Sequence, residues 1–257
     1  MNGIDVIKTF ELLYPRDLAY NWDNVGLQVG TLNKKINNIL LSLDLTLEVV
    51  EEAISNNIEL IIVHHPLIFQ AMKSIDTDSY KGKLIEKLIK SDITLYVAHT
   101  NFDVSNYGMN SILANMLSLK NQEVLEFTTE DEGLGKVGVI NSTPMKEYIS
   151  IVKNTFKVNN ARFIGDLNGI VSKVAITGGS GSSTIQVASD NSVDLLITGD
   201  ISYHHAHDAL AIGLNILDIG HNIEKYFVNE LKNILIDKGI TSNIVISKIN
   251  TDPYKFV

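Results

Sequence analysis

Histidine is the residue type in this sequence that offers the most chemistry. The 257 residues include seven histidines and no cysteine. A neutral imidazole can bind a transition metal, and because imidazole titrates near neutral pH it can also transfer protons. Without cysteine the chain has no thiolate zinc site, disulfide or cysteine nucleophile, so a bound metal must be held by nitrogen and oxygen. The histidines occur at positions 64, 65, 99, 204, 205, 207 and 221.

The pair His64 and His65 follows the apolar run Leu60–Val63 and precedes Pro66. Successive side chains on extended backbone point to opposite sides, and a proline keeps the residue before it extended. The two imidazoles are therefore expected to diverge, which suits two metal ions better than one. The alternative is a strand end that is capped by two solvated rings.

Carboxylates accompany two of the other histidines. Asp103 follows His99 by four residues, and its carboxylate can bridge two cations. His221 and Glu224 are three residues apart at the start of the last amphipathic helix, where side chains at that spacing share one face. An imidazole and a carboxylate on one helical face are a recurrent pair of ligands for a divalent ion.

Together these residues predict a centre of two divalent metal ions per chain. Nitrogen and oxygen ligands do not choose between zinc, manganese, iron or a similar metal. Five protein ligands leave coordination positions open for water, which catalysis requires. The predicted ligands are His64, His65, Asp103, His221 and Glu224.

A glycine-rich segment, Thr177–Ser183, lies between a predicted strand and a predicted helix. Backbone amides in such a segment can surround an anion, so it is a candidate site for a substrate phosphate. It lacks the lysine of a P-loop and the spacing of the dinucleotide-binding motif, which disfavours NTPases and Rossmann dehydrogenases. The alternative is a tight turn with a serine cap. The candidate phosphate-binding residues are Gly178, Gly179, Ser180 and Gly181.

Further histidines follow Asp200, in the order Tyr203-His204-His205-Ala206-His207. His204 is a candidate catalytic residue, because an imidazole can act as a general acid or base near neutral pH. The same cluster can instead form hydrogen bonds that orient metal ligands, and the sequence leaves both roles open. Glu224 is the other candidate catalytic residue, in addition to its role as a ligand.

Along most of the chain, short β-branched runs typical of strands alternate with helical patterns. This alternation is typical of βαβ units, which would hold the residues above in place. In the first half, strands are predicted near Asn38–Leu43, Glu59–Val63 and Ile93–Ala98, with helices near Leu47–Ser55 and Lys81–Lys90. In the second half, strands are predicted near Val171–Ile176, Val193–Thr198 and Leu214–Asp218, with helices near Thr184–Ser189 and His204–Ile212. A helix from about Asn222 to Leu235 and a strand near Asn243–Ile246 complete the pattern.

Each predicted strand runs into polar residues, and sites in open α/β sheets lie beyond the carboxyl ends of the strands. The sequence therefore predicts an α/β fold in which two similar domains, with mostly parallel sheets, face a shared metal-binding cleft. The polar stretch Asn121–Glu132 contains the predicted boundary. Domain A is predicted at residues 1–126 and domain B at 127–242, with the C-terminal strand, about 243–257, returning to domain A.

The charge balance bears on the partners. Lys and Arg number 21 against 30 Asp and Glu, which gives a net charge of -9, and the longest basic cluster is Lys34–Lys35. Binding to nucleic acid or to an anionic membrane is therefore disfavoured. No apolar run approaches the roughly 18 residues that span a bilayer, and the N-terminus lacks the basic region of a secretory signal. A cytoplasmic protein is expected.

Six motifs occur in the order found in the NIF-three-like family, whose members are commonly named GTP cyclohydrolase I type 2 homologues. The motifs are Asn24–Gly30, His64–Pro66, His99–Asp103, Thr177–Gly181, Gly199–Asp200 with Tyr203–His204, and Gly220–Glu224. The sequence resembles this family over nearly its whole length, and it looks like the short form that lacks an inserted domain. The resemblance implies a dinuclear metal site between two α/β domains, with the same five ligands, and a toroidal homohexamer built as a trimer of dimers.

Two functions from different classes are compatible with these features. The first is a metal-dependent hydrolase, similar to GTP cyclohydrolase I type 2, that acts on a nucleotide or a phosphorylated heterocycle. Two divalent ions would lower the pKa of a water molecule for attack on the imidazole ring of a purine, or on a phosphoester. The second is a non-catalytic, metal-binding hexamer with a regulatory or partner-binding role. Metal-dependent turnover of a nucleotide would distinguish them.

Overall fold

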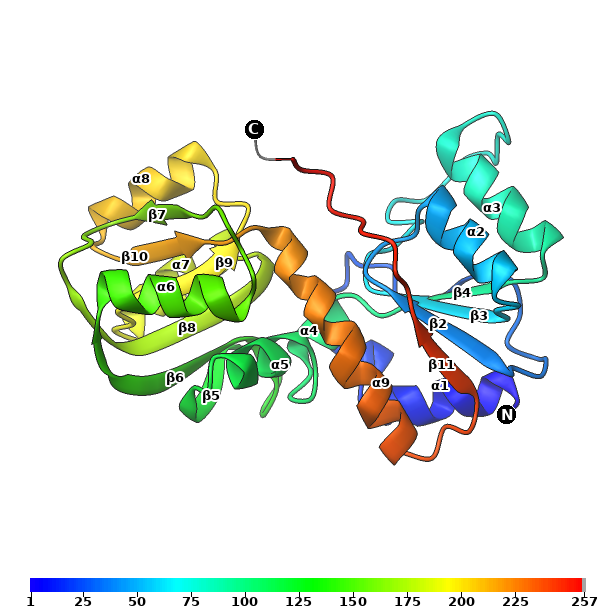
Figure 1. Ribbon diagram of the computed structural model, residues 1–257, viewed down its shortest axis with the longest axis horizontal. Helices are drawn as coiled ribbons and strands as arrows, with labels where there is room; N and C mark the ends of the chain where they lie inside the picture. Colours follow the sequence, from blue (N-terminus) through cyan, green and yellow to red (C-terminus); the bar gives the residue numbers. More distant parts are fainter. Residues whose placement is uncertain (256–257) are drawn as a thin grey trace. The chain divides into compact units, whose positions relative to one another are not determined.

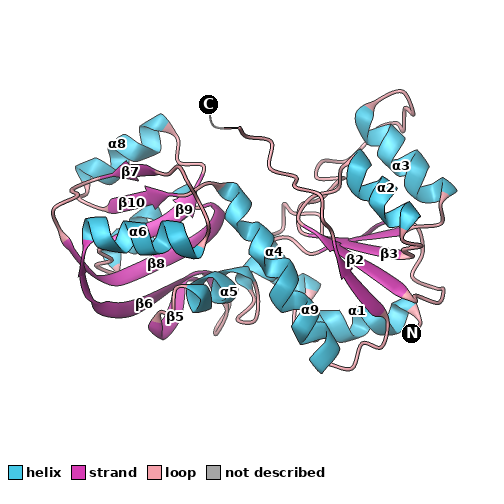
Figure 2. Cartoon of the chain, in the orientation of Figure 1, coloured by secondary structure: helices cyan, strands magenta, loops and turns pink. Residues whose placement is uncertain are grey.

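A computed structural model describes residues 1–255 of the chain. The chain divides into two compact units, drawn in Figure 1. Unit 1 consists of Met1–Phe102 and Phe227–Pro253, and unit 2 consists of Asp103–Tyr226 with residues 254–255. Each unit has helices packed on a β-sheet (Figure 2), so the predicted α/β class is confirmed.

Unit 1 contains a five-stranded sheet with the strand order β1-β4-β3-β2-β11. Strands β4, β3, β2 and β11 are parallel neighbours, and β1 pairs with β4 in the antiparallel direction. The strands are β1 (Gly26–Val29), β2 (Asn38–Ser42), β3 (Leu60–Val63), β4 (Thr94–Val97) and β11 (Asn243–Ile246). The helices are α1 (Gly3–Glu11), η1 (Arg16–Leu18), α2 (Leu47–Ser55), α3 (Tyr80–Lys90) and α9 (Phe227–Asp237).

Helices cover both faces of this sheet, which explains why its central strands are continuous apolar runs. Helices α2 and α3 pack on one face, and α1 and α9 lie on the other (Figure 1). All four residues of β3 and of β4 are buried. The side chains of Thr46 and Ser79 cap the first turns of α2 and α3, so both helices begin where the apolar pattern does.

Unit 2 contains a six-stranded sheet with the strand order β5-β6-β8-β9-β10-β7. Strands β8, β9 and β10 are parallel, and β5, β6 and β7 add antiparallel pairs. The strands are β5 (Lys120–Phe127), β6 (Gly133–Pro144), β7 (Arg162–Ile164), β8 (Ile170–Ser180), β9 (Leu195–Gly199) and β10 (Asn215–Asp218). The helices are α5 (Met109–Met116), α6 (Met145–Thr155), η2 (Ser182–Thr184), α7 (Ile185–Asp190), α8 (Tyr203–Ala211) and η3 (His221–Tyr226). The short helix α4 (Thr100–Val104) begins in unit 1 and ends in unit 2.

The division of the chain differs from the boundary that the sequence predicted near residue 126. Strands β5 and β6 form an antiparallel hairpin in which Phe127 lies opposite Gly133. The acidic stretch between them is therefore a turn within one unit, and not a linker. The strand expected near residue 243 pairs with β2 of unit 1, and of the predicted segment 243–257 the residues 256–257 lie outside the described part of the chain.

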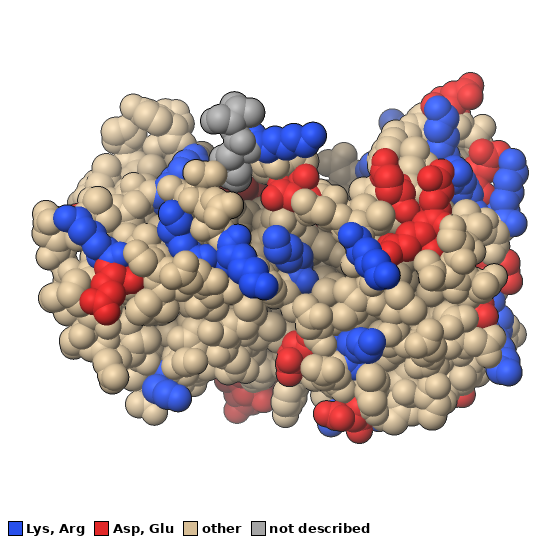
Figure 3. Space-filling view, viewed as in Figure 1, with Lys and Arg blue, Asp and Glu red and all other residues tan. Residues whose placement is uncertain are grey.

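Two surface features bear on the predicted partners. On the face drawn in Figure 3, acidic and basic side chains are interspersed over α2 and α3. Nζ of Lys87 lies 3.2 Å from Oε1 of Glu51, and Nζ of Lys90 lies 2.7 Å from Oε1 of Glu86. Within residues 1–255, no helix combines the length and the apolar character that crossing a membrane requires.

Candidate metal centre

Three histidines of unit 1 lie together beyond the carboxyl ends of β3 and β4. His64 and His65 directly follow β3, and His99 comes two residues after β4. One ring nitrogen of each lies within 4.8 Å of those of the other two. The centroid of the His64 ring is 5.0 Å from that of His65 and 5.2 Å from that of His99. The sequence predicted His64 and His65 as ligands, but it did not single out His99.

The chain bends where β3 ends. The backbone N–H groups of His64 and His65 both donate to the carbonyl oxygen of Leu43, each at 3.1 Å. Because the backbone is not extended here, the two rings do not diverge as expected, and both join the cluster with His99. The expected divergence is therefore corrected, and the pair contributes to one histidine cluster.

The three rings have the same orientation relative to their supports, because each Nδ1 faces an oxygen acceptor. An acceptor at Nδ1 fixes the hydrogen there and leaves the lone pair of Nε2 for a metal ion. The contacts are His64 Nδ1 to Ala98 O at 2.8 Å, His65 Nδ1 to Asp44 Oδ1 at 2.6 Å, and His99 Nδ1 to Asp23 Oδ1 at 2.9 Å.

The two supporting carboxylates stay ionised although they are partly buried. Burial alone would raise the pKa of Asp23, but its bonds with His99 and Thr100 outweigh this effect and lower the pKa to about 2. Burial likewise opposes the ionisation of Asp44, and the bond with His65 lowers its pKa below the ordinary value. Both carboxylates therefore keep the negative charge that makes a neighbouring imidazole a stronger ligand.

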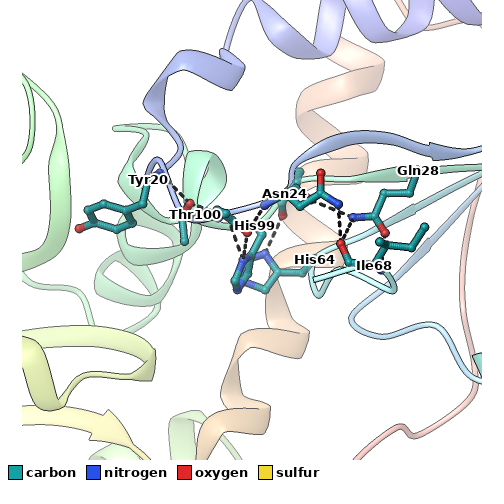
Figure 4. Close-up of polar contacts among 9 residues, drawn as sticks. Tyr20, Asn24, Gln28, His64, Ile68, His99 and Thr100 are labelled. Carbon is teal, nitrogen blue, oxygen red and sulfur yellow. Dashed lines mark hydrogen bonds and ion pairs between the residues drawn. The ribbon is translucent and has the colours of Figure 1, made fainter. Parts of the chain in front are cut away.

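A network of hydrogen bonds fixes the loop that carries Asp23, as Figure 4 shows around Tyr20, Asn24 and Gln28. The Tyr20 N–H donates to Thr100 Oγ1 at 3.1 Å. The Asn24 side chain donates to the carbonyl oxygen of Ile68, and the Ile68 N–H donates to Gln28 Oε1 at 2.8 Å. In the sequence this loop is marked only by the family motif Asn24–Gly30, because its hydrogen-bond partners are distant along the chain.

The remaining predicted ligands lie together in unit 2. Nε2 of His221 is 3.1 Å from Oε2 of Glu224, and a carboxylate oxygen of Asp103 lies within 4.8 Å of one of Glu224. Both His221 and Glu224 belong to η3, a 3-10 helix, and not to the start of an α-helix as predicted. Residues three apart are eclipsed in a 3-10 helix, which brings these two side chains together. Nδ1 of His221 faces Asp200 Oδ2 at 2.8 Å, the same kind of support found in unit 1.

The glycine-rich segment packs against this second group of ligands. Gly178 and Gly179 belong to β8, which continues through Ser180, so this part of the segment is a strand end and not the tight turn considered as the alternative. A Cβ on Gly179 would lie 2.6 Å from Glu224 Oε1 and 3.2 Å from His221 Nε2. The absence of a side chain at Gly179 therefore leaves room for the two ligands.

Two of the candidate phosphate-binding glycines have a structural explanation. The Gly178 N–H donates to Asn110 Oδ1 at 2.8 Å, and Asn110 Nδ2 donates to the carbonyl oxygen of Asp103 at 2.9 Å. The Gly178 amide is thus engaged within the chain, and its role in binding a substrate phosphate stays a prediction. A Cβ on Gly181 would lie 2.2 Å from Thr198 Oγ1, so close packing explains that glycine. Asn110 is a supporting residue that sequence analysis missed.

His204 lies elsewhere in unit 2, exposed in the first turn of α8. Its ring contacts that of Tyr203, with centroids 5.7 Å apart. Among the described residues, the groups of three side chains that could hold a metal include no residue of α8. The structure therefore does not bring His204 together with the predicted ligands, and its catalytic role stays a prediction.

The donors in the two units fit divalent metal ions. Unit 1 offers imidazole nitrogens that are oriented by oxygen acceptors, and unit 2 offers an imidazole with two carboxylates. Such mixed nitrogen and oxygen sets suit zinc, manganese, iron or nickel. Metal binding by these residues is thus compatible with the structure.

Comparison with known proteins places these features in a family. The family model for Duf34/NIF3 (NGG1p interacting factor 3) matches residues 1–253. The chain belongs to the Duf34/NIF3 family. This confirms the resemblance on which the sequence analysis relied.

Several Duf34/NIF3 relatives match the whole chain. The GTP cyclohydrolase 1 type 2 homolog of Clostridium perfringens is 38% identical, over 98% of both chains. The homolog of Listeria monocytogenes is 31% identical and covers 99% of both, in an alignment of 368 positions that is longer than this chain. A Bacillus cereus protein related to NIF3 has a solved structure with a TM-score of 0.95 and 32% identity, covering 100% of this chain and 99% of that one.

Proposed function

We propose that this Duf34/NIF3 protein binds two divalent metal ions per chain and acts as a metal-dependent hydrolase on a nucleotide or a phosphorylated heterocycle. The proposed ligands are His64, His65, Asp103, His221 and Glu224. The observation that carries the proposal is the histidine cluster of unit 1, in which each Nδ1 faces an acceptor. Structural histidines need no such uniform orientation, whereas metal ligands do.

The chemical character of the donors supports carboxylates as well as imidazoles among the ligands. The cluster in unit 1 consists of imidazoles, while both proposed carboxylate ligands belong to unit 2. Neutral imidazoles alone leave the charge of two divalent cations uncompensated, and two carboxylates reduce it. We therefore propose that the carboxylates of Asp103 and Glu224 would hold the ions together with the histidines, and would lower their net charge.

The bound ions would supply a water molecule of lowered pKa and would stabilise developing negative charge. The protein residues would orient the ligands and move protons. Glu224 is our first candidate for proton transfer, since its side chain is buried next to His221. His204 is retained as a second candidate, which would need the substrate to reach the exposed first turn of α8.

The substrate class rests on the relatives. Those of Clostridium perfringens and Listeria monocytogenes carry the name GTP cyclohydrolase 1 type 2 homolog, which supports a nucleotide as the ligand. In this proposal Ser180 and the neighbouring backbone contact the phosphate, and water is added either to the imidazole ring of the purine, which opens, or across the phosphoester of the nucleotide, which is cleaved. The family also leads us to propose a homohexamer built as a trimer of dimers. A monomer in light scattering at micromolar concentration would contradict the hexamer.

A turnover assay tests the proposed activity. Protein that is stripped of metal and reconstituted with zinc, manganese or iron is incubated with a panel of nucleotides, and products are separated by chromatography. Metal-dependent product that disappears in Asp103→Asn supports the hydrolase. Tight metal retention without any product would instead support the non-catalytic, metal-binding alternative.

The control for this assay is Asp208→Asn, which removes an exposed carboxylate of α8 in the same unit. It should keep both metal and turnover. Circular dichroism of Asp103→Asn should match that of the unmodified protein, because its side chain is not part of either apolar core. Unfolding of that variant would mean that lost turnover does not report on the metal site.

A further inference from the structure

Two exposed aromatic side chains lie beside the histidine cluster of unit 1. Trp22 is 60% exposed and Phe69 is 43% exposed. Their ring centroids are 5.8 Å apart, and their planes meet at 66°. The centroid of the His99 ring is 6.4 Å from that of Trp22 and 6.3 Å from that of Phe69. We call Trp22 and Phe69 the aromatic corner.

The aromatic corner is held from several sides. The ring of Tyr20 stacks on that of Trp22, with centroids 5.5 Å apart and an angle of 10° between the planes. Trp22 directly precedes Asp23, whose carboxylate forms a hydrogen bond with the His99 ring. Phe69 follows Ile68, whose backbone forms hydrogen bonds with the side chains of Asn24 and Gln28, as Figure 4 shows. Both rings are therefore exposed on loops that are fixed by hydrogen bonds.

Such an arrangement differs from a scattered apolar residue on a surface. Single exposed apolar side chains need no explanation. Here two aromatic rings are kept in a fixed mutual geometry next to the histidine cluster. Proteins hold planar heterocycles on aromatic side chains of this kind, because every base presents a π-face. A preformed surface also avoids the entropy cost of ordering side chains during binding.

We infer that the aromatic corner is the subsite for the planar heteroaromatic ring of the ligand, which stacks on Trp22 with its edge toward Phe69. This assignment deepens the proposed function. The reaction at the stacked ring rests on the proposed hydrolase, whereas binding of the ring to the aromatic corner does not. A ring in this position lies next to His99, so the bond to be hydrolysed comes close to the histidine cluster. The ring, and not only the phosphate, then determines which ligands bind.

The test uses Trp22 as its own reporter, since it is the single tryptophan of the chain. Guanosine 5′-monophosphate is titrated into the full-length protein with and without metal, and the tryptophan fluorescence is recorded. Ribose 5-phosphate, which has the same sugar and phosphate but no base, is the matched ligand. The inference predicts quenching by the nucleotide in both metal states and none by ribose 5-phosphate. No quenching by the nucleotide, or equal quenching by both, would overturn it.

Calorimetry of variants provides the second readout. Trp22→Ala should weaken nucleotide binding by about 5- to 150-fold, the range typical for replacing an aromatic side chain that stacks on one base, while Trp22→Phe should retain most of the affinity. Ile89→Ala is the matched control, because Ile89 is 61% exposed on α3 and precedes the amino end of β4, whereas His99 follows its carboxyl end. The Ile89→Ala variant should bind the nucleotide with the affinity of the unmodified protein.

Metal content separates this inference from the proposed hydrolase. Trp22→Ala should keep its metal, since the indole is not a ligand. Absent turnover together with base-dependent quenching would reject the hydrolase and keep the subsite. If Trp22→Ala instead changes the size of the oligomer and leaves nucleotide affinity unaltered, the aromatic corner is an interface between copies of the chain, and the inference is wrong.

Discussion

Nδ1 of His65 lies 2.6 Å from Oδ1 of Asp44, although 21 residues separate them in the chain. Asp44 comes shortly after β2, and His65 comes shortly after β3, which is the parallel neighbour of β2. The sheet therefore places a supporting carboxylate next to a proposed ligand, by the same rule that brings His99 to the cluster. This support can be removed without touching the ligand.

Asp44→Asn should weaken metal binding while the fold is retained. The amide keeps the shape of the side chain but loses the charge that orients His65 and makes it a stronger ligand. Loss of such a supporting group typically lowers metal affinity about 10- to 100-fold. Competition with a chelator of known affinity measures the change. Asp17→Asn, which alters an exposed carboxylate of η1, should leave the affinity as it is. Equal affinity in the two variants would remove Asp44 from the site.

Gly179→Ala should disturb the ligands in unit 2. The added Cβ would lie 2.6 Å from Glu224 Oε1, and the backbone of Gly179 has a φ of +60°, which L residues rarely adopt. We expect loss of metal measured by elemental analysis, because Glu224 must move. Gly213→Ala is the matched control, since Gly213 has a φ of +74° but nothing within 4 Å of the added Cβ. Gly213→Ala carries the same backbone strain of about 1–2 kcal/mol from a positive φ, but its Cβ collides with no other atom. Unchanged metal in Gly179→Ala would show that Glu224 is not a ligand in this position.

Asp194 should make unit 2 sensitive to acid. Burial opposes its ionisation, but bonds from the N–H groups of Lys173 and Ser172 and from the Ser172 hydroxyl outweigh this and lower its pKa below the ordinary value of 3.8. A carboxyl whose pKa is lower in the folded state stabilises the fold above its unfolded pKa. That contribution is lost as the pH falls from the unfolded pKa, about 3.9, through the lower folded value.

Asp194→Asn should therefore reduce the free energy of unfolding by about 1–2 kcal/mol at neutral pH, in line with bonds to a charged acceptor. The difference from the unmodified protein should shrink as the pH falls below about 4. Urea denaturation at several pH values measures both effects. Asp208→Asn, an exposed change in the same unit, should stay within about 0.5 kcal/mol of the unmodified protein. A pH-independent difference for Asp194→Asn would contradict the role assigned to its charge.

The central parallel strands, such as β3 and β4, were predictable because they are apolar runs buried on both faces. The bounds of α2 and of β11 agree with the predicted Leu47–Ser55 and Asn243–Ile246. Strand β3 is shorter than predicted by one residue at its start, and β4 by one residue at each end. The antiparallel strands β5 and β6 were missed. Five of the eight residues of β5 are polar or charged, and most are at least partly exposed, so the run lacks the apolar signal of a strand. The boundary expected near residue 126 followed from this omission.

Only part of the site could be predicted from the sequence, for a similar reason. Histidines after strands could be found from their spacing, because parallel strands end at one edge. The supports could not, since Asp23 is 76 residues from His99 and Asn110 is 68 residues from Gly178. The glycine-rich segment was ambiguous for a related reason. Whether Gly179 contacts a ligand or a side chain depends on η3, which is more than forty residues away in the sequence.

The most direct test of the central claim is the metal content of the protein, purified without added metal or chelator and measured by elemental analysis. We expect two divalent ions per chain in the unmodified protein and loss of metal in His65→Ala, with the circular dichroism spectrum retained. Ile89→Ala, the exposed control in unit 1, should carry the same metal as the unmodified protein. A well-folded protein that binds no divalent metal, even after incubation with zinc, manganese or iron, would contradict the account.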